Sequence, residues 1–207
     1  MHTPGQIIIL NGPPRSGKTS ISHAIQNSYP GLWLNLGVDL WMRATPARYH
    51  PGIGLRPGGE RPDLETHLPA LYAALYESIA AHSRQGINIV TDVGHHDWYS
   101  RPLGILPDCA RRLLGLTALL VGIHCPLDMI MERRRVTGWH NDPPDTPAPE
   151  PVQRWQQAVH QPGIYDLELD TSQLSPEQCA ERIHQHLVSG PPPHAIAQLA
   201  QQAHPTA

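Results

Sequence analysis

Short runs of apolar residues alternate along the chain with segments whose apolar residues recur every three or four positions. The runs predict five strands, at Gln6–Asn11, Leu32–Gly37, Ile87–Asp92, Thr117–His124 and Ile164–Leu169. Runs of this kind are typical of parallel strands that are buried on both faces. The alternation of strands and helices therefore predicts an α/β fold with a mainly parallel sheet and helices on both faces.

The intervening segments predict amphipathic helices. The first follows the first strand and ends before Pro30, because proline cannot continue a helix. A longer helix ends at Gly86 and carries its apolar face on Leu68, Leu71, Tyr72, Leu75, Tyr76 and Ile79. Pro107 and Pro126 are each predicted to be the first residue of a helix, where the missing N–H costs nothing. Ser175–Gln178 has the pattern of a capping box and predicts the last helix, to about Val188.

Two long segments between these elements lack periodicity. Arg43–Glu65 is rich in Gly, Pro and Arg, and Gly138–Pro151 contains too many prolines for regular structure. Stretches of this length are kept in a compact domain for function or as mobile surface. The segment after Ser189 contains three consecutive prolines, at 191–193, and has little that could join a core. The prediction is one domain over residues 1–189 and a disordered tail over 190–207.

The composition is that of a globular domain. The 207 residues are 40% hydrophobic and 16% charged, with a formal net charge of −3, which favours neither disorder nor a basic nucleic-acid-coating protein. No apolar run approaches the roughly 20 residues of a membrane span, and Ile7–Leu10 is too short for a signal sequence, so we expect a cytoplasmic protein. The three cysteines, which lack CxxC spacing, are predicted to be reduced core thiols: Cys109, Cys125 and Cys179.

The chain has a single lysine, because 14 of its 15 basic residues are arginines. That lysine, Lys18, lies in a match to GxxxxGK(S/T) placed between a strand and a helix, the pattern of a phosphate-binding loop. The pattern predicts that backbone N–H groups and Lys18 bind the phosphates of ATP and that Thr19 binds Mg²⁺. The predicted nucleotide-binding residues of this loop are Gly12, Pro13, Pro14, Arg15, Ser16, Gly17, Lys18, Thr19 and Ser20.

Two aspartates follow predicted strands. Asp92 ends Ile87–Asp92, the form expected of a carboxylate that holds Mg²⁺, although an aspartate that caps the next loop has the same pattern. Asp39 ends the second strand at the carboxyl edge of the sheet, where it could accept the proton of a substrate hydroxyl or be purely structural. Trp41 and Met42 follow closely, and they suit an apolar substrate pocket or the core equally well.

Arginines at a predicted helix end are the remaining candidates for phosphate contacts. In Glu132–Arg135 the side chains point in different directions, so at most one or two can face a nucleotide. Arg134 is predicted to bind the cofactor and Arg135 to act on the transferred phosphoryl group, with a solvated basic helix end as the alternative. In the first long segment, Arg48 and Arg56 could face substrate or solvent, and Arg56 is included in the predicted acceptor site.

His95 and His96, followed by Asp97, lie after the third predicted strand. No second cluster has clear metal-ligand spacing, so we predict a place in the substrate pocket rather than metal ligation. A loop at a sheet edge that is polar for solvation alone is the alternative. The single lysine also excludes classes of protein, since none remains for the guanine-specificity motif of GTPases or for the strand lysine of protein kinases. A small-molecule kinase remains.

The ordered set of motifs resembles the chloramphenicol phosphotransferase-like proteins, which are P-loop kinases. The resemblance covers roughly residues 5 to 189 and rests on GQIIILNGPPRSGKTS, WLNLGVDLWM, PGIGLRPGGERPDLE, INIVTDVGHHD, VGIHCPLDMIMERR and YDLELDTS. It implies a three-layer α/β/α sandwich with a five-stranded parallel sheet of order 2-3-1-4-5. It also implies transfer of the γ-phosphate of ATP to a hydroxyl, with Asp39 as the base.

The sequence therefore predicts an ATP- and Mg²⁺-dependent O-phosphotransferase whose second substrate is a hydroxylated small molecule such as chloramphenicol. A kinase for nucleotides, nucleosides or nucleic-acid 5′-hydroxyls is one alternative. A nucleotide-binding regulator with weak catalysis is another. Membrane and nucleic-acid partners are not expected, and homo-oligomerisation stays open.

Overall fold

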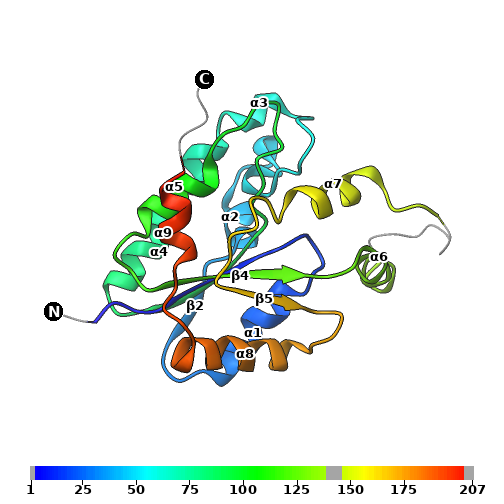
Figure 1. The fold of residues 1–207 in the computed structure, drawn as a ribbon. Helices are drawn as coiled ribbons and strands as arrows, with labels where there is room; N and C mark the ends of the chain where they lie inside the picture. Colours follow the sequence, from blue (N-terminus) through cyan, green and yellow to red (C-terminus); the bar gives the residue numbers. More distant parts are fainter. Residues whose placement is uncertain (1–2, 139–145, 203–207) are drawn as a thin grey trace.

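A computed structural model describes residues 3–138 and 146–202 of the chain. Its centre is a five-stranded sheet of order β2-β3-β1-β4-β5, and every neighbouring pair of strands is parallel (Figure 1). The central strand β1 (Ile7–Asn11) pairs on one side with Ile89–Val93 and on the other with Ala118–Gly122. The predicted fold class and strand order are confirmed.

Each strand lies close to its predicted position. The other strands are β2 (Trp33–Asn35), β3 (Asn88–Val93), β4 (Ala118–His124) and β5 (Leu167–Asp170). The main helices are α1 (Lys18–Ser28), α2 (Val38–Ala44), α3 (Pro62–Glu65), α4 (Leu68–Arg84), α5 (Ile105–Arg112), α6 (Leu127–Val136), α7 (Glu150–Ala158), α8 (Pro176–Ser189) and α9 (Ala195–Ala200). Two short 3₁₀ helices, η1 (Ala47–Tyr49) and η2 (Gly52–Gly54), lie between α2 and α3.

Alternate residues of the central strand enter different halves of the core. Ile8 and Leu10 pack in a cluster with residues of α1 and α8, whereas Ile7 and Ile9 pack with residues of α4, α5 and α9. The helices accordingly cover both faces of the sheet (Figure 1). Because β1 is buried on both faces, its sequence is a continuous apolar run rather than an alternating one. The three cysteines are buried free thiols, as predicted.

The prolines that were predicted to open helices lie at neighbouring positions instead. Helix α5 begins at Ile105, so Pro107 is its third residue, and Pro126 is the residue before α6 rather than the first residue in it. The prolines can lie away from the first helical position because the first four N–H groups of a helix all lack an intrahelical acceptor, so proline is tolerated at any of them. The capping box is confirmed, since Ser175 Oγ accepts from the Gln178 N–H at 3.2 Å.

The two segments predicted to be irregular contain short helices. Residues 43–65 include the end of α2, both 3₁₀ helices and α3, and the second segment overlaps the start of α7, where Pro151 lies in the first turn. Residues 139–145 of the second segment lie outside the described part of the chain. The sequence did not predict α7, and because a first turn tolerates proline, the proline content of this segment did not exclude the start of a helix there.

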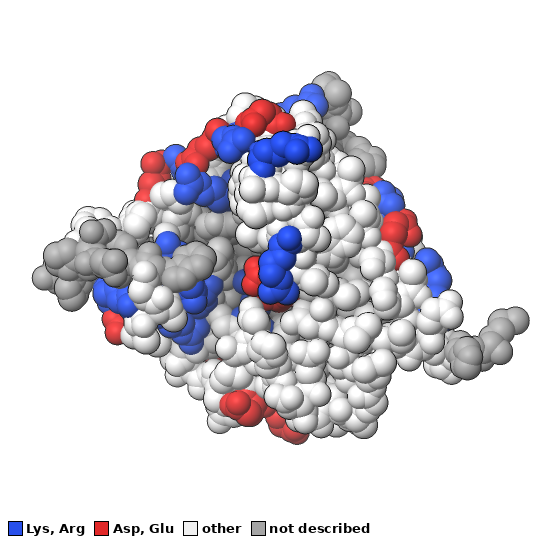
Figure 2. All heavy atoms as spheres, turned by 180° about the vertical axis from the view of Figure 1, so that it is seen from behind, with Lys and Arg blue, Asp and Glu red and all other residues white. Residues whose placement is uncertain are grey.

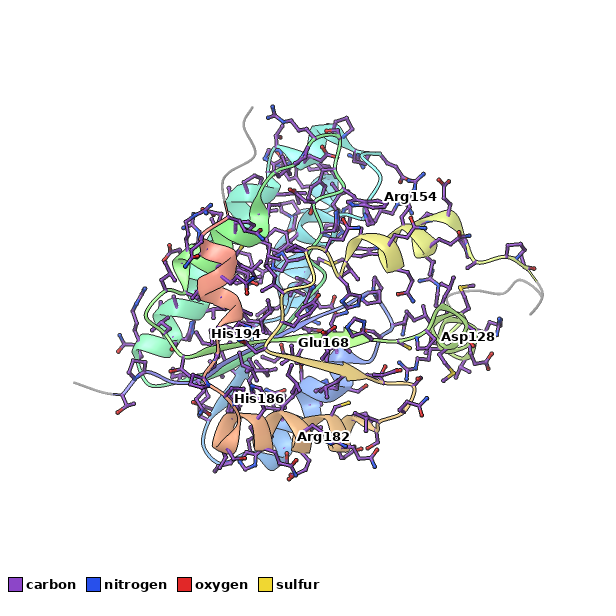
Figure 3. All side chains as sticks on the ribbon, in the orientation of Figure 1. Asp128, Arg154, Glu168, Arg182, His186 and His194 are labelled. Carbon is purple, nitrogen blue, oxygen red and sulfur yellow. The ribbon has the colours of Figure 1, made fainter. Side chains whose placement is uncertain are left out.

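The prediction of a disordered tail over 190–207 is wrong for residues 195–200. These form α9, whose Ala195, Ile196 and Leu199 are buried in the core beside α5. Both ends of α9 are bound by side chains from distant elements. Asp166 Oδ1 accepts from the N–H groups of His194 and Ala195 at 2.7 and 2.9 Å, and Arg111 Nη1 donates to the Gln202 carbonyl at 3.2 Å. Figure 3 labels His194 at the start of this helix.

Charges of both signs share the face shown in Figure 2, where acidic and basic residues lie side by side along the upper edge. Within residues 3–138 and 146–202, no helix has the length and apolar character needed to span a membrane.

Candidate active site

The phosphate loop joins the end of β1 to the start of α1 in the conformation expected of an anion-binding nest. Gly17 and Arg15 both have positive φ, at 96° and 70°, and Gly17 is the residue that caps α1. Positive φ is unfavourable for a residue such as arginine, so the surrounding contacts must hold Arg15 there. A Cβ atom on Gly12 would lie 2.4 Å from the Ile123 carbonyl oxygen, which explains why this position requires glycine.

Lys18 points back across the mouth of the loop. Its Nζ donates to the carbonyl oxygens of Gly12 and Pro13, each at 2.8 Å, which leaves the third N–H for a ligand. Burial lowers the pKa of Lys18 to about 8, although the nearby carboxylates of Asp92 and Asp39 act in the opposite direction. The ammonium is therefore held in a poorly hydrated position, where a phosphate would be its natural counter-ion.

Thr19 and Asp92 form the second part of the site. The Thr19 hydroxyl donates to Asp92 Oδ2 at 2.8 Å, and Asp92 is only 5% exposed at the end of β3. A Cβ atom on Gly37 would lie 1.7 Å from Asp92 Oδ1, so the backbone before α2 approaches this carboxylate closely. The two residues predicted to bind the metal thus meet, although they are 73 positions apart in the sequence.

Asp39 lies in the first turn of α2 rather than at the end of β2, which is a correction to its predicted place. The strand ends at Asn35, whose Oδ1 accepts from the Gly37 N–H at 2.9 Å and so turns the chain into the helix. The Asp39 side chain is exposed, and its charge reaches Lys18. The carboxylate therefore stands at the same edge of the sheet as the phosphate loop.

A cavity of about 580 Å³ opens beside the phosphate loop. The loop contributes Pro13 and Pro14, and the opposite walls come from residues 51–61 and from α7. The lining is mixed, with arginines and one carboxylate among apolar groups: Pro13, Pro14, Pro51, Gly54, Leu55, Arg56, Glu60, Arg61, Arg134, Pro151, Val152 and Trp155. We name this space the transfer cavity. It brings Arg56, predicted from sequence, to the phosphate loop.

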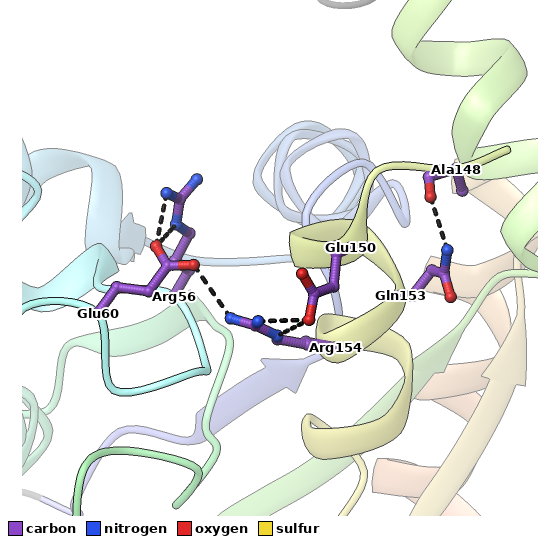
Figure 4. A network of polar contacts seen from close by, with 6 residues as sticks. All are labelled: Arg56, Glu60, Ala148, Glu150, Gln153 and Arg154. Atoms are coloured by element: carbon purple, nitrogen blue, oxygen red, sulfur yellow. Dashed lines mark hydrogen bonds and ion pairs between the residues drawn. The ribbon is translucent and has the colours of Figure 1, made fainter. Parts of the chain in front are cut away.

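An ion-pair network connects two walls of the transfer cavity (Figure 4). Arg56 Nε donates to Glu60 Oε2 at 2.7 Å, and Arg154 Nη1 on α7 donates to Glu60 Oε1 at 3.0 Å. Arg154 also pairs with Glu150 on its own helix. The four side chains alternate in sign, so the network adds no net charge to the cavity. Arg61 is likewise paired, with Asp63 at 2.7 Å.

The three consecutive arginines of α6 have different surroundings. Arg134 lines the transfer cavity, and both burial and the nearby charge of Arg15 lower its pKa. Arg135 pairs with Glu132 on the same helix and is not part of the cavity lining. Arg133, which the sequence did not single out, donates to the Arg15 carbonyl at 3.2 Å. Helix periodicity alone could not decide which of the three reaches the loop.

His95 and His96 line a different, smaller cavity of about 440 Å³ with Trp98 and Gln161. His96 Nδ1 accepts from the Trp98 N–H, so its Nε2 donates to the Leu55 carbonyl at 3.0 Å and the ring is neutral. His95 Nε2 lies 2.7 Å from the Tyr76 hydroxyl, and burial lowers its pKa to about 3. Both rings are therefore neutral groups in the packing around the site.

Trp41 and Met42 are partly buried and pack against the core, and Met42 contacts the backbone at Gly54 beside the transfer cavity. Ser16 is buried within the phosphate loop, whereas Ser20 is exposed on α1.

No group of three or more His, Cys, Asp or Glu side chains that could hold a metal occurs in the described residues.

Asn11 is a site residue that sequence analysis missed. It ends β1 directly before the phosphate loop, and its Oδ1 accepts from the His95 N–H at 2.7 Å. Its Nδ2 donates to the Val159 carbonyl and the Tyr165 hydroxyl, at 2.9 and 2.8 Å. One buried amide thus ties the base of the loop to the segments after β3 and α7. A polar residue at the end of an otherwise apolar strand was the available signal.

The sheet order and the phosphate loop together define the fold of a P-loop kinase. Among solved structures, the chain is similar to the tunicamycin resistance protein of Deinococcus radiodurans, with a TM-score of 0.58 and 19% identity over 89% of this chain and 96% of that one. It is also similar to the shikimate kinase of Acinetobacter baumannii in complex with shikimate, with a TM-score of 0.59 and 13% identity over 90% of this chain and 95% of that one. Identities this low establish the common fold alone.

Sequence comparison gives the family. Residues 5–188 match the family described as "Chloramphenicol phosphotransferase-like protein", and the chain belongs to that family. A Mycobacterium tuberculosis protein described as "Putative O-phosphotransferase Rv2636" is 26% identical over 216 residues, which cover 94% of this chain and 88% of that protein. The chain is a phosphotransferase, as the sequence predicted.

Proposed function

We propose that this protein transfers the γ-phosphoryl group of ATP to a hydroxyl of a small uncharged molecule in a Mg²⁺-dependent reaction. The observation that carries the proposal is the transfer cavity, whose lining includes Pro13 and Pro14 of the phosphate loop. Its volume of about 580 Å³ falls within the size range of small-molecule sites. A molecule bound there would lie directly beside the nucleotide phosphates.

The residues of the phosphate loop fit this nucleotide and metal. The Lys18 ammonium keeps one N–H for a phosphate, and the Thr19 hydroxyl and the Asp92 carboxylate are neighbouring hard oxygen donors of the kind that Mg²⁺ prefers. When bound there, Mg²⁺ would supply positive charge against the phosphate oxygens. Lys18 and Arg134 would hold the phosphates in line with the acceptor, since phosphoryl transfer depends mainly on positioning and charge.

Asp39 is the proposed base. Its carboxylate stands near Lys18 and is exposed, so an acceptor hydroxyl could reach it. Because the transition state of phosphoryl transfer is largely dissociative, the main task of the carboxylate is to aim the hydroxyl and to take its proton late. Asp92 is less suited to that task, because its Oδ2 is already engaged by Thr19.

The charges around the transfer cavity favour an uncharged acceptor. Arg56 and Arg61, the arginines of the 51–61 wall, are each paired with a carboxylate. The remaining arginine of the lining, Arg134, lies on the side of the phosphate loop. Leu55, Val152 and Trp155 offer apolar contact to the body of the acceptor. This arrangement supports a chloramphenicol-like alcohol over a phosphorylated acceptor such as a nucleotide.

The test is ADP release from ATP in the presence of Mg²⁺ and a panel of hydroxylated compounds. Chloramphenicol, nucleosides, nucleoside monophosphates and neutral sugars form the panel, and Lys18→Ala is the matched inactive variant. We expect turnover that depends on a neutral acceptor and is lost in Lys18→Ala. Turnover only with nucleoside monophosphates would replace the proposed acceptor class. Nucleotide binding without turnover on any compound would favour the regulator.

A further inference from the structure

Thr171, the first residue after β5, contacts the outer side of the phosphate loop. Its hydroxyl donates to the Ser16 carbonyl at 2.7 Å, and the side chain is buried. A Cβ atom placed on Gly17 would lie 3.7 Å from the Thr171 methyl group, so the two residues are in close packing. Thr171 is 155 positions from Ser16 in the sequence.

Arg133 on α6 completes this contact. Its Nη2 donates to the Thr171 carbonyl at 2.7 Å, and its Nη1 donates to the Thr171 hydroxyl at 3.1 Å and to the Arg15 carbonyl at 3.2 Å. One guanidinium therefore binds both Thr171 and the residue of the loop that has a positive φ of 70°. The Thr171 hydroxyl accepts from Arg133, and of the two carbonyl oxygens within reach of its proton, that of Ser16 at 2.7 Å is closer than that of His124 at 3.2 Å.

The orientation of two peptide groups follows from these contacts. In a trans peptide the carbonyl and the following N–H point in opposite directions. When Thr171 holds the Ser16 carbonyl on the outer side of the loop, the Gly17 N–H is turned to the inner side, where phosphates bind in a loop of this type. Arg133 similarly holds the Arg15 carbonyl outside and keeps that residue in the left-handed region.

We propose that Thr171 and Arg133 are positioning residues that hold the phosphate loop in its nucleotide-binding conformation before the nucleotide arrives. The inference rests on the nucleotide binding in the proposed function and adds residues that act through the loop. Without them, part of the binding free energy is spent on ordering Arg15 to Gly17, and affinity falls. The loss concerns ligands that carry phosphates, because the contacts to Ser16 and Arg15 act on the loop that binds phosphates.

Thr171→Val tests the hydroxyl, because valine keeps the shape and loses the hydrogen bonds. Dissociation constants for ADP with Mg²⁺ and for adenosine would be measured by isothermal titration calorimetry, with no acceptor present. We expect Thr171→Val to weaken ADP binding about tenfold, the equivalent of one or two hydrogen bonds, and to leave adenosine binding unchanged. Thr171→Ser, which restores the hydroxyl, should bind ADP within about threefold of the wild type. Ser172→Ala is the matched control, because Ser172 has no hydrogen bond to the phosphate loop.

The outcomes are distinct. Equal weakening of ADP and adenosine, or a Thr171→Ser variant as weak as Thr171→Val, would show that packing rather than the hydroxyl matters and would overturn the proposal. ADP affinity within twofold of the wild type in Thr171→Val would do the same. If thermal unfolding shows that Thr171→Val does not fold, Arg133→Lys, which keeps the charge and loses the bidentate contact, is measured against the same two ligands. Wild-type protein that binds no ADP would instead refute the proposed function.

Discussion

The Thr19 hydroxyl donates a hydrogen bond of 2.8 Å to Asp92 Oδ2, and this pair joins the start of α1 to the end of β3. Asp92 is also covered by the backbone at Gly37, so its carboxylate has a fixed direction. Neighbouring oxygens of this kind suit a magnesium ion shared with the phosphates of ATP.

Asp92→Asn should raise the Mg²⁺ concentration needed for half-maximal turnover by about tenfold or more, because a neutral amide is a weaker ligand than a carboxylate. Turnover should fall by more than ATP affinity, since metal charge matters most as the phosphoryl group departs. Steady-state Mg²⁺ titrations of wild type and variant measure both effects, and exposed Asp128→Asn on α6 is the control. Superimposable titrations would return Asp92 to a structural role.

Gly37→Ala should reproduce much of this defect. The φ of Gly37 is −62°, so backbone conformation is not the obstacle, but the new Cβ would lie 1.7 Å from Asp92 Oδ1. The carboxylate or the start of α2 must therefore shift. We expect a raised Mg²⁺ requirement in the same titration. Val38→Ala, one residue later, removes side-chain atoms without this clash and should leave the titration unchanged.

ADP affinity should fall as pH rises through about 8. The pKa of Lys18 is lowered from 10.5 to about 8 by burial, so the ammonium is protonated below that pH and loses its proton above it. Phosphates bind the protonated form, so binding above pH 8 requires proton uptake and weakens by up to about tenfold per pH unit. Calorimetry from pH 6.5 to 9.5 measures the trend.

Because the chain has a single lysine, the lowered pKa of Lys18 can be measured directly by NMR. Lysine-selective ¹³C labelling gives one side-chain signal, whose titration reports the pKa of Lys18 without assignment. The midpoint should lie near pH 8 in the free protein and move upward with ADP. A midpoint above pH 10 in the free protein would show that burial does not control this group.

Asp39→Asn should cut acceptor-dependent turnover by about 10²- to 10⁴-fold, the usual contribution of a general base, while ATP binding survives. Asparagine keeps the shape of the side chain and loses its basicity. The comparison uses turnover and ATP affinity of both proteins across pH 6 to 9. If the variant retains more than about a tenth of wild-type turnover, Asp39 is not the base.

Asp166→Ala should lower the free energy of unfolding by about 3 kcal/mol, because a buried carboxylate that accepts from backbone N–H groups makes strong hydrogen bonds. Asp166 accepts from Leu120, His194 and Ala195, and its side chain is 1% exposed. Urea unfolding measures the change. His194→Ala removes the exposed ring and its 3.1 Å contact with Asp166 Oδ1 but keeps the backbone N–H donors, so it should cost less, and equal stabilities of the two variants would contradict this role of Asp166.

Local patterns in the sequence were sufficient for the elements and for the phosphate loop. Buried parallel strands require continuous apolar runs, and the loop requires glycine and lysine at fixed spacing, so both leave a signal within about ten residues. Thr19 follows the first strand and Asp92 ends the third, so the strand order implied by the resemblance, which places these two strands side by side, also brings Thr19 next to Asp92. Apolar periodicity by itself did not give that order, because it says which face is buried and not which strand lies beside which.

Only the tertiary structure decided the contacts that depend on distant partners. Arg133 rather than Arg135 reaches the phosphate loop because of how α6 is rotated against Thr171. Helix α9 is ordered because Asp166 and the core beside α5 supply hydrogen bonds and apolar contacts that its six residues cannot provide. Glu60 and Arg154 join two walls of the transfer cavity, and they meet only because the fold brings together segments that are 94 positions apart in the sequence. Sequence periodicity records the residues that a segment buries, whereas the partner is fixed only when the sheet brings the segments together.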